Sequence, residues 1–205
     1  MRFPPERLIR RIVDRIKKDD GLVLINEVTT GVGRTGNWFG FQHYGISPDI
    51  VALGKSIGNG YPVSVTVFAP EVLHRLVGGQ LKYAQSHQND PLGAAVAREV
   101  VQIVLEQELI DRGRETAAIL LAGLQDIKAR TDALREIRAR GLMVALELDD
   151  DANTTLTTDV HRALVNQGYV LGKRPGLNLL RLDPALTIDP GDIEGFLTAL
   201  GNLMT

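Results

Sequence analysis

Residues 25–36 of the chain, I-N-E-V-T-T-G-V-G-R-T-G, end in the pattern G-x-G-x-x-G. In a dinucleotide-binding fold such glycines follow a strand, open a helix and precede an acidic residue about 20 positions later. The apolar residues 22–25 are typical of a buried strand. However, the N-W-F-G-F that follows at 37–41 is a poor helix start, and Asp49 lies in a Ser-Pro-Asp sequence that favours a turn. We therefore expect a loop shaped by glycines and no dinucleotide site.

The overall composition bounds the class of protein. With 205 residues, of which 44% are hydrophobic, the chain can bury a core as one domain or two small ones. The net charge of -2 gives no electrostatic reason to expect nucleic acid or an anionic membrane as a partner. Cysteine is absent, which excludes disulfides and thiolate metal sites. Since no apolar run approaches the ~18 residues of a membrane span and no signal segment follows the first residues, we expect a cytoplasmic protein.

Helical and strand-like patterns alternate along the first half of the chain, which is typical of an α/β fold. Residues 5–18 place apolar side chains on one helical face and Arg and Lys on the other. The other expected elements, in chain order, are strands at 22–25, 49–53 and 63–68, helices near 90–109 and 111–129, strands at 137–140 and 143–148, a helix near 159–167, a strand pair around 169–182 and a helix at 190–204. We therefore predict an α/β domain over residues 1–110 and a smaller α+β domain over residues 111–205.

The second informative stretch is residues 49–62, D-I-V-A-L-G-K-S-I-G-N-G-Y-P. Lys55 stands at the end of an apolar strand and is followed at once by glycines. In low-dielectric surroundings the neutral amine of a lysine is favoured, which is the form that Schiff-base chemistry requires. The alternative is a strand-end lysine whose charged head lies in solvent. The position alone favours the alternative, and the surrounding residues favour the chemical role.

These two stretches resemble the hallmarks of the class III pyridoxal-phosphate aminotransferases, the ornithine, acetylornithine and GABA type. Residues 26–36 match the family's D-E-V-Q-T-G-F-G-R-T-G, and residues 39–50 match its aromatic pair, its H-Y-G and its P-D-I. Residues 55–62 match its lysine followed by G-N-G-Y-P. The resemblance extends from residue 3 to about residue 200 and covers the C-terminal half of the family. It implies about three strands of the fold type I large domain and a C-terminal α+β small domain.

The resemblance implies a role for several residues, with pyridoxal 5'-phosphate as cofactor. Lys55 matches the lysine that forms the internal aldimine and shuttles the proton between Cα and C4′. Val28 matches the residue beneath the pyridine ring, and Ser86 matches a threonine that reaches the cofactor phosphate of the partner subunit. Arg181 matches the arginine that binds a substrate carboxylate bidentately. The alternative to each role is purely structural: Val28 is then a core valine, Ser86 a loop serine and Arg181 a surface arginine. The histidines lack partners at metal-ligand spacing, so we predict no metal site.

Two cofactor-binding positions depart from the family pattern. Asn26 replaces the aspartate that pairs with the pyridine nitrogen. An ionised aspartate stabilises a protonated ring nitrogen and makes the ring an electron sink, whereas an asparagine is neutral and can donate as well as accept. Thr29 replaces the glutamine that meets the ring hydroxyl and is shorter than it. We expect both changes to alter the electronic environment of the ring.

The resemblance implies that the chain is about half as long as the family's members, and we expect it to lack their phosphate-binding turn and ring-stacking aromatic. Two hypotheses follow. In the first, the chain belongs to an aminotransferase that moves an amino group from an ω-amino donor to a 2-oxo acid, and is inactive alone. In the second, it is a non-catalytic truncated homologue with an interaction or structural role. In both, exposed strand edges predict a homodimer or a complementary N-terminal half as partner.

Overall fold

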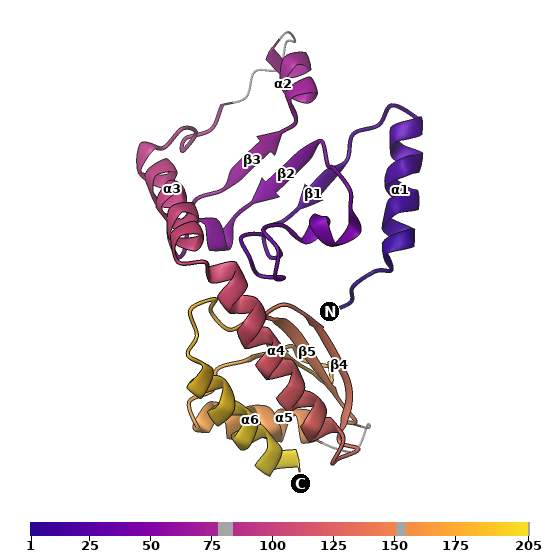
Figure 1. Cartoon of the computed structure of the whole chain (residues 1–205), viewed down its shortest axis with the longest axis vertical. Coiled ribbons are helices and arrows are strands. Elements are labelled where there is room, and N and C mark those ends of the chain that lie inside the picture. The colour runs from indigo at the N-terminus through magenta and orange to yellow at the C-terminus, as the bar shows by residue number, and fades with distance from the viewer. Residues whose placement is uncertain (78–83, 151–154, 205) are drawn as a thin grey trace. The chain divides into compact units, whose positions relative to one another are not determined.

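The computed structural model of the chain describes residues 1–77, 84–150 and 155–204 (Figure 1). It divides into two compact units. The first unit is Phe3–Leu109, and the second unit comprises Met1–Arg2 with Ile110–Thr205. Each unit has its own sheet, so the two are described separately.

The first unit is built on a three-stranded sheet in the order β1 (Leu24–Asn26), β2 (Ile50–Leu53) and β3 (Val65–Phe68) (Figure 1). Strands β1 and β2 run parallel, and β3 pairs with β2 antiparallel. Val51 and Leu53 of the central strand are buried, as β-branched and aliphatic residues in the middle of a sheet should be.

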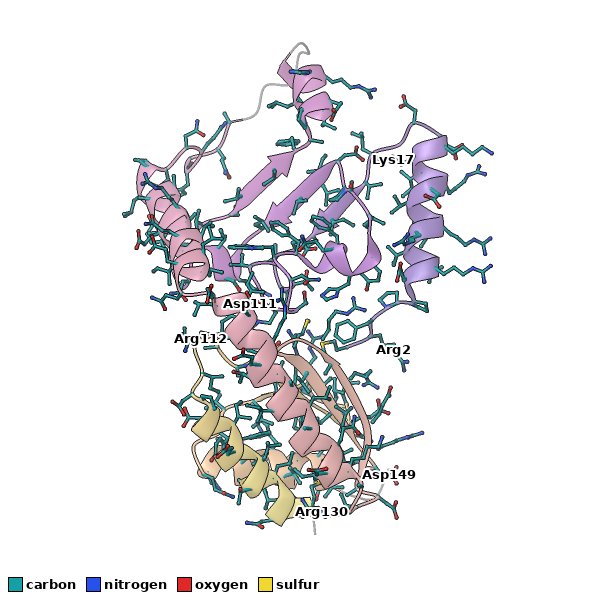
Figure 2. All side chains as sticks on the ribbon, in the orientation of Figure 1. Arg2, Lys17, Asp111, Arg112, Arg130 and Asp149 are labelled. Atoms are coloured by element: carbon teal, nitrogen blue, oxygen red, sulfur yellow. The ribbon has the colours of Figure 1, made fainter. Side chains whose placement is uncertain are left out.

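Helix α1 (Glu6–Lys18) is joined to this sheet through its last turn. The ammonium of Lys17, labelled in Figure 2, pairs with the carboxylate of Asp49, and the other oxygen of Asp49 accepts the N–H of Val23 at 2.6 Å. The Lys17 bond and then the Val23 bond lower the pKa of Asp49. Asp49 therefore ties the helix to the starts of β1 and β2.

Two further helices complete the first unit. The short helix α2 (Pro70–Val77) was not predicted, because eight residues contain too few turns to show a helical period. Helix α3 (Pro91–Glu106) begins where the sequence predicts it, and the side chain of Asp90 accepts the N–H groups of Leu92 and Gly93 at 3.1 and 3.2 Å. The glycines of residues 31–36 open no helix; a 3-10 turn, η1 (Gly40–Tyr44), follows them instead.

The second unit is a four-stranded antiparallel sheet in the order β4-β5-β7-β6, with three helices packed on it. Its elements are α4 (Leu109–Lys128), β4 (Leu134–Arg140), β5 (Met143–Leu148), α5 (Leu156–Asn166), β6 (Gly172–Lys173), β7 (Leu179–Leu182) and α6 (Pro190–Met204) (Figure 1). One face of the sheet meets Leu124, Leu164 and Leu200, which are completely buried and come from the three helices. The alternating strand pattern thus gives one apolar face and one charged face.

Candidate active site

Lys55 lies just beyond the carboxyl end of β2, in the 3-10 turn η2 (Lys55–Ile57). Its backbone has φ +47°, in the left-handed region. This region costs a residue with a side chain roughly 1–2 kcal/mol. The conformation is held because the carbonyl oxygen of Lys55 accepts the N–H groups of Gly58 and Asn59 at 2.9 and 3.1 Å. Backbone strain of this kind concentrates at functional positions.

The side chain of Lys55 is exposed, and its Nζ donates to Thr29 Oγ1 at 2.8 Å. The low-dielectric surroundings that the apolar strand suggested are therefore not formed by the described part of this chain. The strand buries Leu53, but Lys55 lies two residues beyond it, where the sheet has ended.

Asn26 is the last residue of β1 and is also exposed. Its Oδ1 accepts the backbone N–H of Val28 at 3.0 Å. Since a backbone N–H can only donate, the oxygen of this amide is identified, and the Nδ2 hydrogens are the donors that Asn26 can offer to another group.

Val28 packs against the residue that precedes Lys55. A Cβ atom placed on Gly54 would lie 3.4 Å from Val28 Cγ1, which is ordinary van der Waals contact. The structure thus brings Asn26, Val28, Thr29 and Lys55 together at the carboxyl ends of the parallel strands β1 and β2. Such strand ends are the usual place for a ligand in an open α/β sheet.

A buried carboxylate closes the glycine loop beside this cluster. Glu27 is 2% exposed and accepts the N–H groups of Gly40 and Phe41 at 2.9 and 2.8 Å, as well as the hydroxyl of Thr30. A Cβ atom on Gly40 would lie 2.9 Å from Thr30 Cβ, so only glycine fits there without movement. Sequence reasoning assigned Glu27 no role, although an acidic residue directly after an apolar strand was a signal.

Ser86 lies at some distance along the chain from this cluster, exposed in the turn that precedes α3. The start of α3 is tied to the glycine stretch after Lys55, because Tyr61 donates its hydroxyl to Asp90 at 2.9 Å. This bond lowers the pKa of Asp90 and raises that of Tyr61. Tyr61 therefore connects the start of α3 with the glycine stretch that follows Lys55. Among the described residues, Ser86 is not brought into contact with Lys55.

Arg181 lies in the second unit, on β7. Its register with Ala145 places it on the face of the sheet opposite to the helices, the face that also carries Arg138 and Glu147. Arg138 donates to Glu147 at 2.7 Å and lowers its pKa. Arg181 Nη2 donates to Asp183 Oδ1 at 3.1 Å, and its Nε lies 2.8 Å from Oδ2 although that N–H does not point at the oxygen. Arg181 is thus already paired with a carboxylate.

Around this ion pair the second unit forms a pocket of about 350 Å³. It is lined by Met1, Gly172, Lys173, Arg174, Leu177, Leu179, Arg181 and Asp183. Three of these residues are basic, Lys173, Arg174 and Arg181, and only Asp183 is acidic, so the pocket suits an anionic group.

Within residues 1–77, 84–150 and 155–204, no helix is both long enough and apolar enough to cross a bilayer. The same part of the chain contains no group of three or more His, Cys, Asp or Glu side chains placed to hold a metal ion.

The chain thus carries a strand-end lysine beside a glycine loop on a mixed sheet, followed by a second α+β unit. The family model for aminotransferase class-III matches residues 1–204, and the chain belongs to this family. It is 31% identical over 199 residues to a leucine/methionine racemase of Thermococcus litoralis, covering 95% of this chain and 44% of that protein. It is 27% identical to an acetylornithine aminotransferase of Methanothermobacter thermautotrophicus, covering 99% of this chain and 50% of that protein.

A solved structure of a transaminase from the marine bacterium Virgibacillus matches with a TM-score of 0.90 and 27% identity. The match covers 98% of this chain and 49% of that one. The fold type I transaminase fold expected from the resemblance is therefore confirmed, and the chain spans about half the length of the curated relatives it matches.

Membership of this family supports pyridoxal 5'-phosphate as the cofactor that the resemblance implies. The residues around Lys55 fit the ring side of that molecule. Lys55 offers an exposed amine, Asn26 an amide N–H and Val28 an apolar surface, all at one end of the sheet. The donor set at Asn26 fits an unprotonated ring nitrogen, because Nδ2 can only donate.

Proposed function

We propose that this chain carries the lysine half of a class III aminotransferase site, which moves an amino group from an ω-amino donor to a 2-oxo acid. The single observation that carries the proposal is the placement of the Lys55 amine. It is exposed at the carboxyl ends of two parallel strands and adjoins Thr29, with Asn26 and Val28 beside it. A buried core lysine or one far from the glycine loop would not serve this purpose.

When bound, pyridoxal phosphate supplies an aldehyde and an electron-accepting ring. Lys55 would hold the cofactor aldehyde through its amine and would carry the proton removed from the amino donor. Val28 would pack against one face of the ring, and Asn26 Nδ2 would donate to the ring nitrogen. Because asparagine carries no charge, this chain stabilises a protonated ring less than the family's aspartate does.

Arg181 is proposed to bind the carboxylate of the amino donor or of the 2-oxo acid. A guanidinium presents two parallel N–H groups that match the two oxygens of a carboxylate. In the second unit Arg181 Nη2 already donates to Asp183, so a substrate carboxylate competes with this internal partner. We expect Asp183→Asn to favour acidic substrates for this reason. Ser86, from the exposed turn before α3, is proposed to donate its hydroxyl to the cofactor phosphate of a partner subunit.

A partner is proposed to cover the apolar surface of the first unit. Leu22 and Leu24, beside and on the edge strand β1, are 48% and 57% exposed, and Leu8 and Ile12 of α1 are 51% and 47% exposed. An edge strand with unpaired backbone groups and bare apolar side chains favours association with another chain. The proposed partner is a second copy of this chain or a polypeptide equivalent to the other half of the relatives' length.

The alternative function is a non-catalytic homologue with an interaction or structural role. Two replacements favour it for the chain alone. Asn26 replaces the charged partner of the ring, and Thr29 replaces the longer glutamine that meets the ring hydroxyl. Both weaken the electrostatic preorganisation that such catalysis requires.

The experiment that separates the two is addition of pyridoxal phosphate to the chain, alone and together with the half of a full-length relative that this chain does not match. The aminotransferase proposal predicts a visible absorbance band that Lys55→Ala abolishes, with weak binding to the chain alone that the added half strengthens. Absence of a Lys55-dependent band under both conditions would support the non-catalytic role.

A further inference from the structure

The hydrogen bond between Lys55 and Thr29 joins two residues that are 26 positions apart, at 2.8 Å. Thr29 is half-buried in the turn after β1, whereas Lys55 is exposed. The hydroxyl therefore comes from the better fixed side of the contact, and the lysine side chain extends to it.

The backbone holds both ends of this contact. On the threonine side, Gly31 donates its N–H to the carbonyl oxygen of Glu27 at 2.9 Å, which closes the turn that contains Thr29. The carboxylate of Glu27 is itself bound by the loop that follows. On the lysine side, Lys55 is held at φ +47° by the bonds to its carbonyl oxygen. The direction in which the lysine side chain leaves the backbone is thus set by the fold.

A threonine hydroxyl has one proton to donate and two lone pairs that accept. It can accept an N–H from the ammonium form of Lys55 and equally from the neutral amine, whose lone pair then stays available for attack. Thr29 can therefore keep Nζ in one place while the amine gains and loses its proton, which an apolar side chain cannot do. A long lysine side chain otherwise distributes itself over many rotamers in solvent.

We propose that Thr29 is a positioning residue that holds the Lys55 amine for attack on an aldehyde. This inference rests on the proposed function, since it assumes that the Lys55 amine is the reacting group. It assigns Thr29 a role toward the lysine of this chain, in addition to any contact with the ring.

The reaction that tests the proposal is capture of pyridoxal phosphate followed by reduction with borohydride. The lone pair of the neutral amine forms a bond to the aldehyde carbon, and the aldehyde oxygen leaves as water with the two amine protons. Borohydride then delivers hydride to the carbon, and the nitrogen takes a proton from water to give a stable secondary amine. Because the product is stable, mass spectrometry of the Lys55 peptide measures the rate even when binding is weak.

The variants are Thr29→Val, which keeps the shape and removes the hydroxyl, and Thr29→Ser, which restores the hydroxyl without the methyl group. Thr66→Val is the matched control, since Thr66 is an exposed threonine on β3 of the same sheet. The labelling rates of Lys17, Lys128 and Lys173 in the same samples are internal references. The unfolding midpoint of each variant is measured in parallel.

We expect Thr29→Val to slow labelling of Lys55 about three- to tenfold, the range of one hydrogen bond. Thr29→Ser should restore the rate to within about twofold, and the reference lysines, Thr66→Val and the unfolding midpoint should not change. An unchanged Lys55 rate in Thr29→Val, or a Thr29→Ser rate as low as that of Thr29→Val, would overturn the inference. If Lys55 of the unmodified chain reacts no faster than the reference lysines, the proposed function itself fails, and that result is distinguishable from the others.

Discussion

The two units of this chain differ in how completely they bury their apolar residues. In the second unit, three helices and a four-stranded sheet enclose a continuous core in which Leu120, Leu146 and Leu180 are fully buried. In the first unit, helix α1 has no buried residue, and the edge strand β1 leaves Leu24 57% exposed. The unit that carries Lys55 therefore leaves its first helix and edge strand exposed, whereas the unit that carries Arg181 encloses a continuous core.

This contrast has a physical consequence for stability. Apolar burial stabilises a fold by roughly 25 cal/mol per Å². The first unit, whose helix α1 and strand β1 leave apolar side chains exposed, therefore gains less of the burial free energy that offsets the loss of chain entropy. We infer that the second unit is stable by itself and that the first depends on a partner.

The largest expected effect compares one leucine from each unit. Leu180→Ala in the second unit should reduce the free energy of unfolding by about 2–5 kcal/mol, because it leaves a cavity in a closed core. At dilutions where the chain is a monomer, Leu22→Ala in the first unit should change it by less than about 1 kcal/mol, since that side chain is 48% exposed in the single chain. Denaturant unfolding gives both free energies, and hydrogen exchange assigns each loss to its unit. Equal losses would mean that Leu22 is covered in the monomer.

The second prediction concerns the charge at the ring position in the first unit. With the unmatched half of a full-length relative supplied, Asn26→Asp should raise the single-turnover rate of transamination by about ten- to a hundredfold, since preorganised charge is a large catalytic term. Asn26→Ala is the control, because it removes the amide without adding a charge. A rate for Asn26→Asp no higher than that of the unmodified chain would show that Asn26 is not the limiting feature.

The third prediction concerns association. Light scattering at micromolar concentration should give a mass above the 22.4 kDa of one chain. Leu24→Lys should shift it toward the monomer, because a charge on an edge strand opposes pairing. Val170→Lys is the matched control in the second unit, where Val170 is 90% exposed but lies outside the regular strands. A clean monomer for the unmodified chain would contradict the proposed partner surface.

The smallest expected effect concerns pH and the joint between α1 and the sheet. The pKa of Asp49 is lowered from its ordinary value of 3.8, so its bonds to Lys17 and Val23 stabilise the first unit above that pH and are lost as the pH falls through the folded-state pKa. Because Lys17 is 41% exposed, the pair contributes less than about 1 kcal/mol.

Hydrogen exchange in α1 between about pH 5 and about pH 2.5 should show this loss, and Asp49→Asn should reduce it. The Arg138–Glu147 pair of the second unit depends on pH in the same direction, so it is followed as a comparison in the same samples. Identical profiles for Asp49→Asn and the unmodified chain would contradict a role of Asp49 at this joint.

Much of the fold could be predicted because it depends on patterns that are local in sequence. The three strands of the first sheet, the cap at Asp90 and the long C-terminal helix each follow from runs of apolar residues and their flanking signals. Helix α2 was missed because it is short, and β4 begins three residues earlier than expected, at Leu134, where tertiary burial extends the strand.

The sequence by itself determined which chemical groups the candidate site offers, since the lysine, the glycine loop and the replacement at Asn26 are visible in the order of residues. Only the tertiary structure decided what those groups contact. It directs the oxygen of Asn26 to Val28, extends Lys55 to Thr29, buries Glu27 under the loop and pairs Arg181 with Asp183. The physical reason is that a hydrogen bond depends on distances of about 3 Å between atoms, and residues far apart in the chain reach such distances only when the backbone has folded.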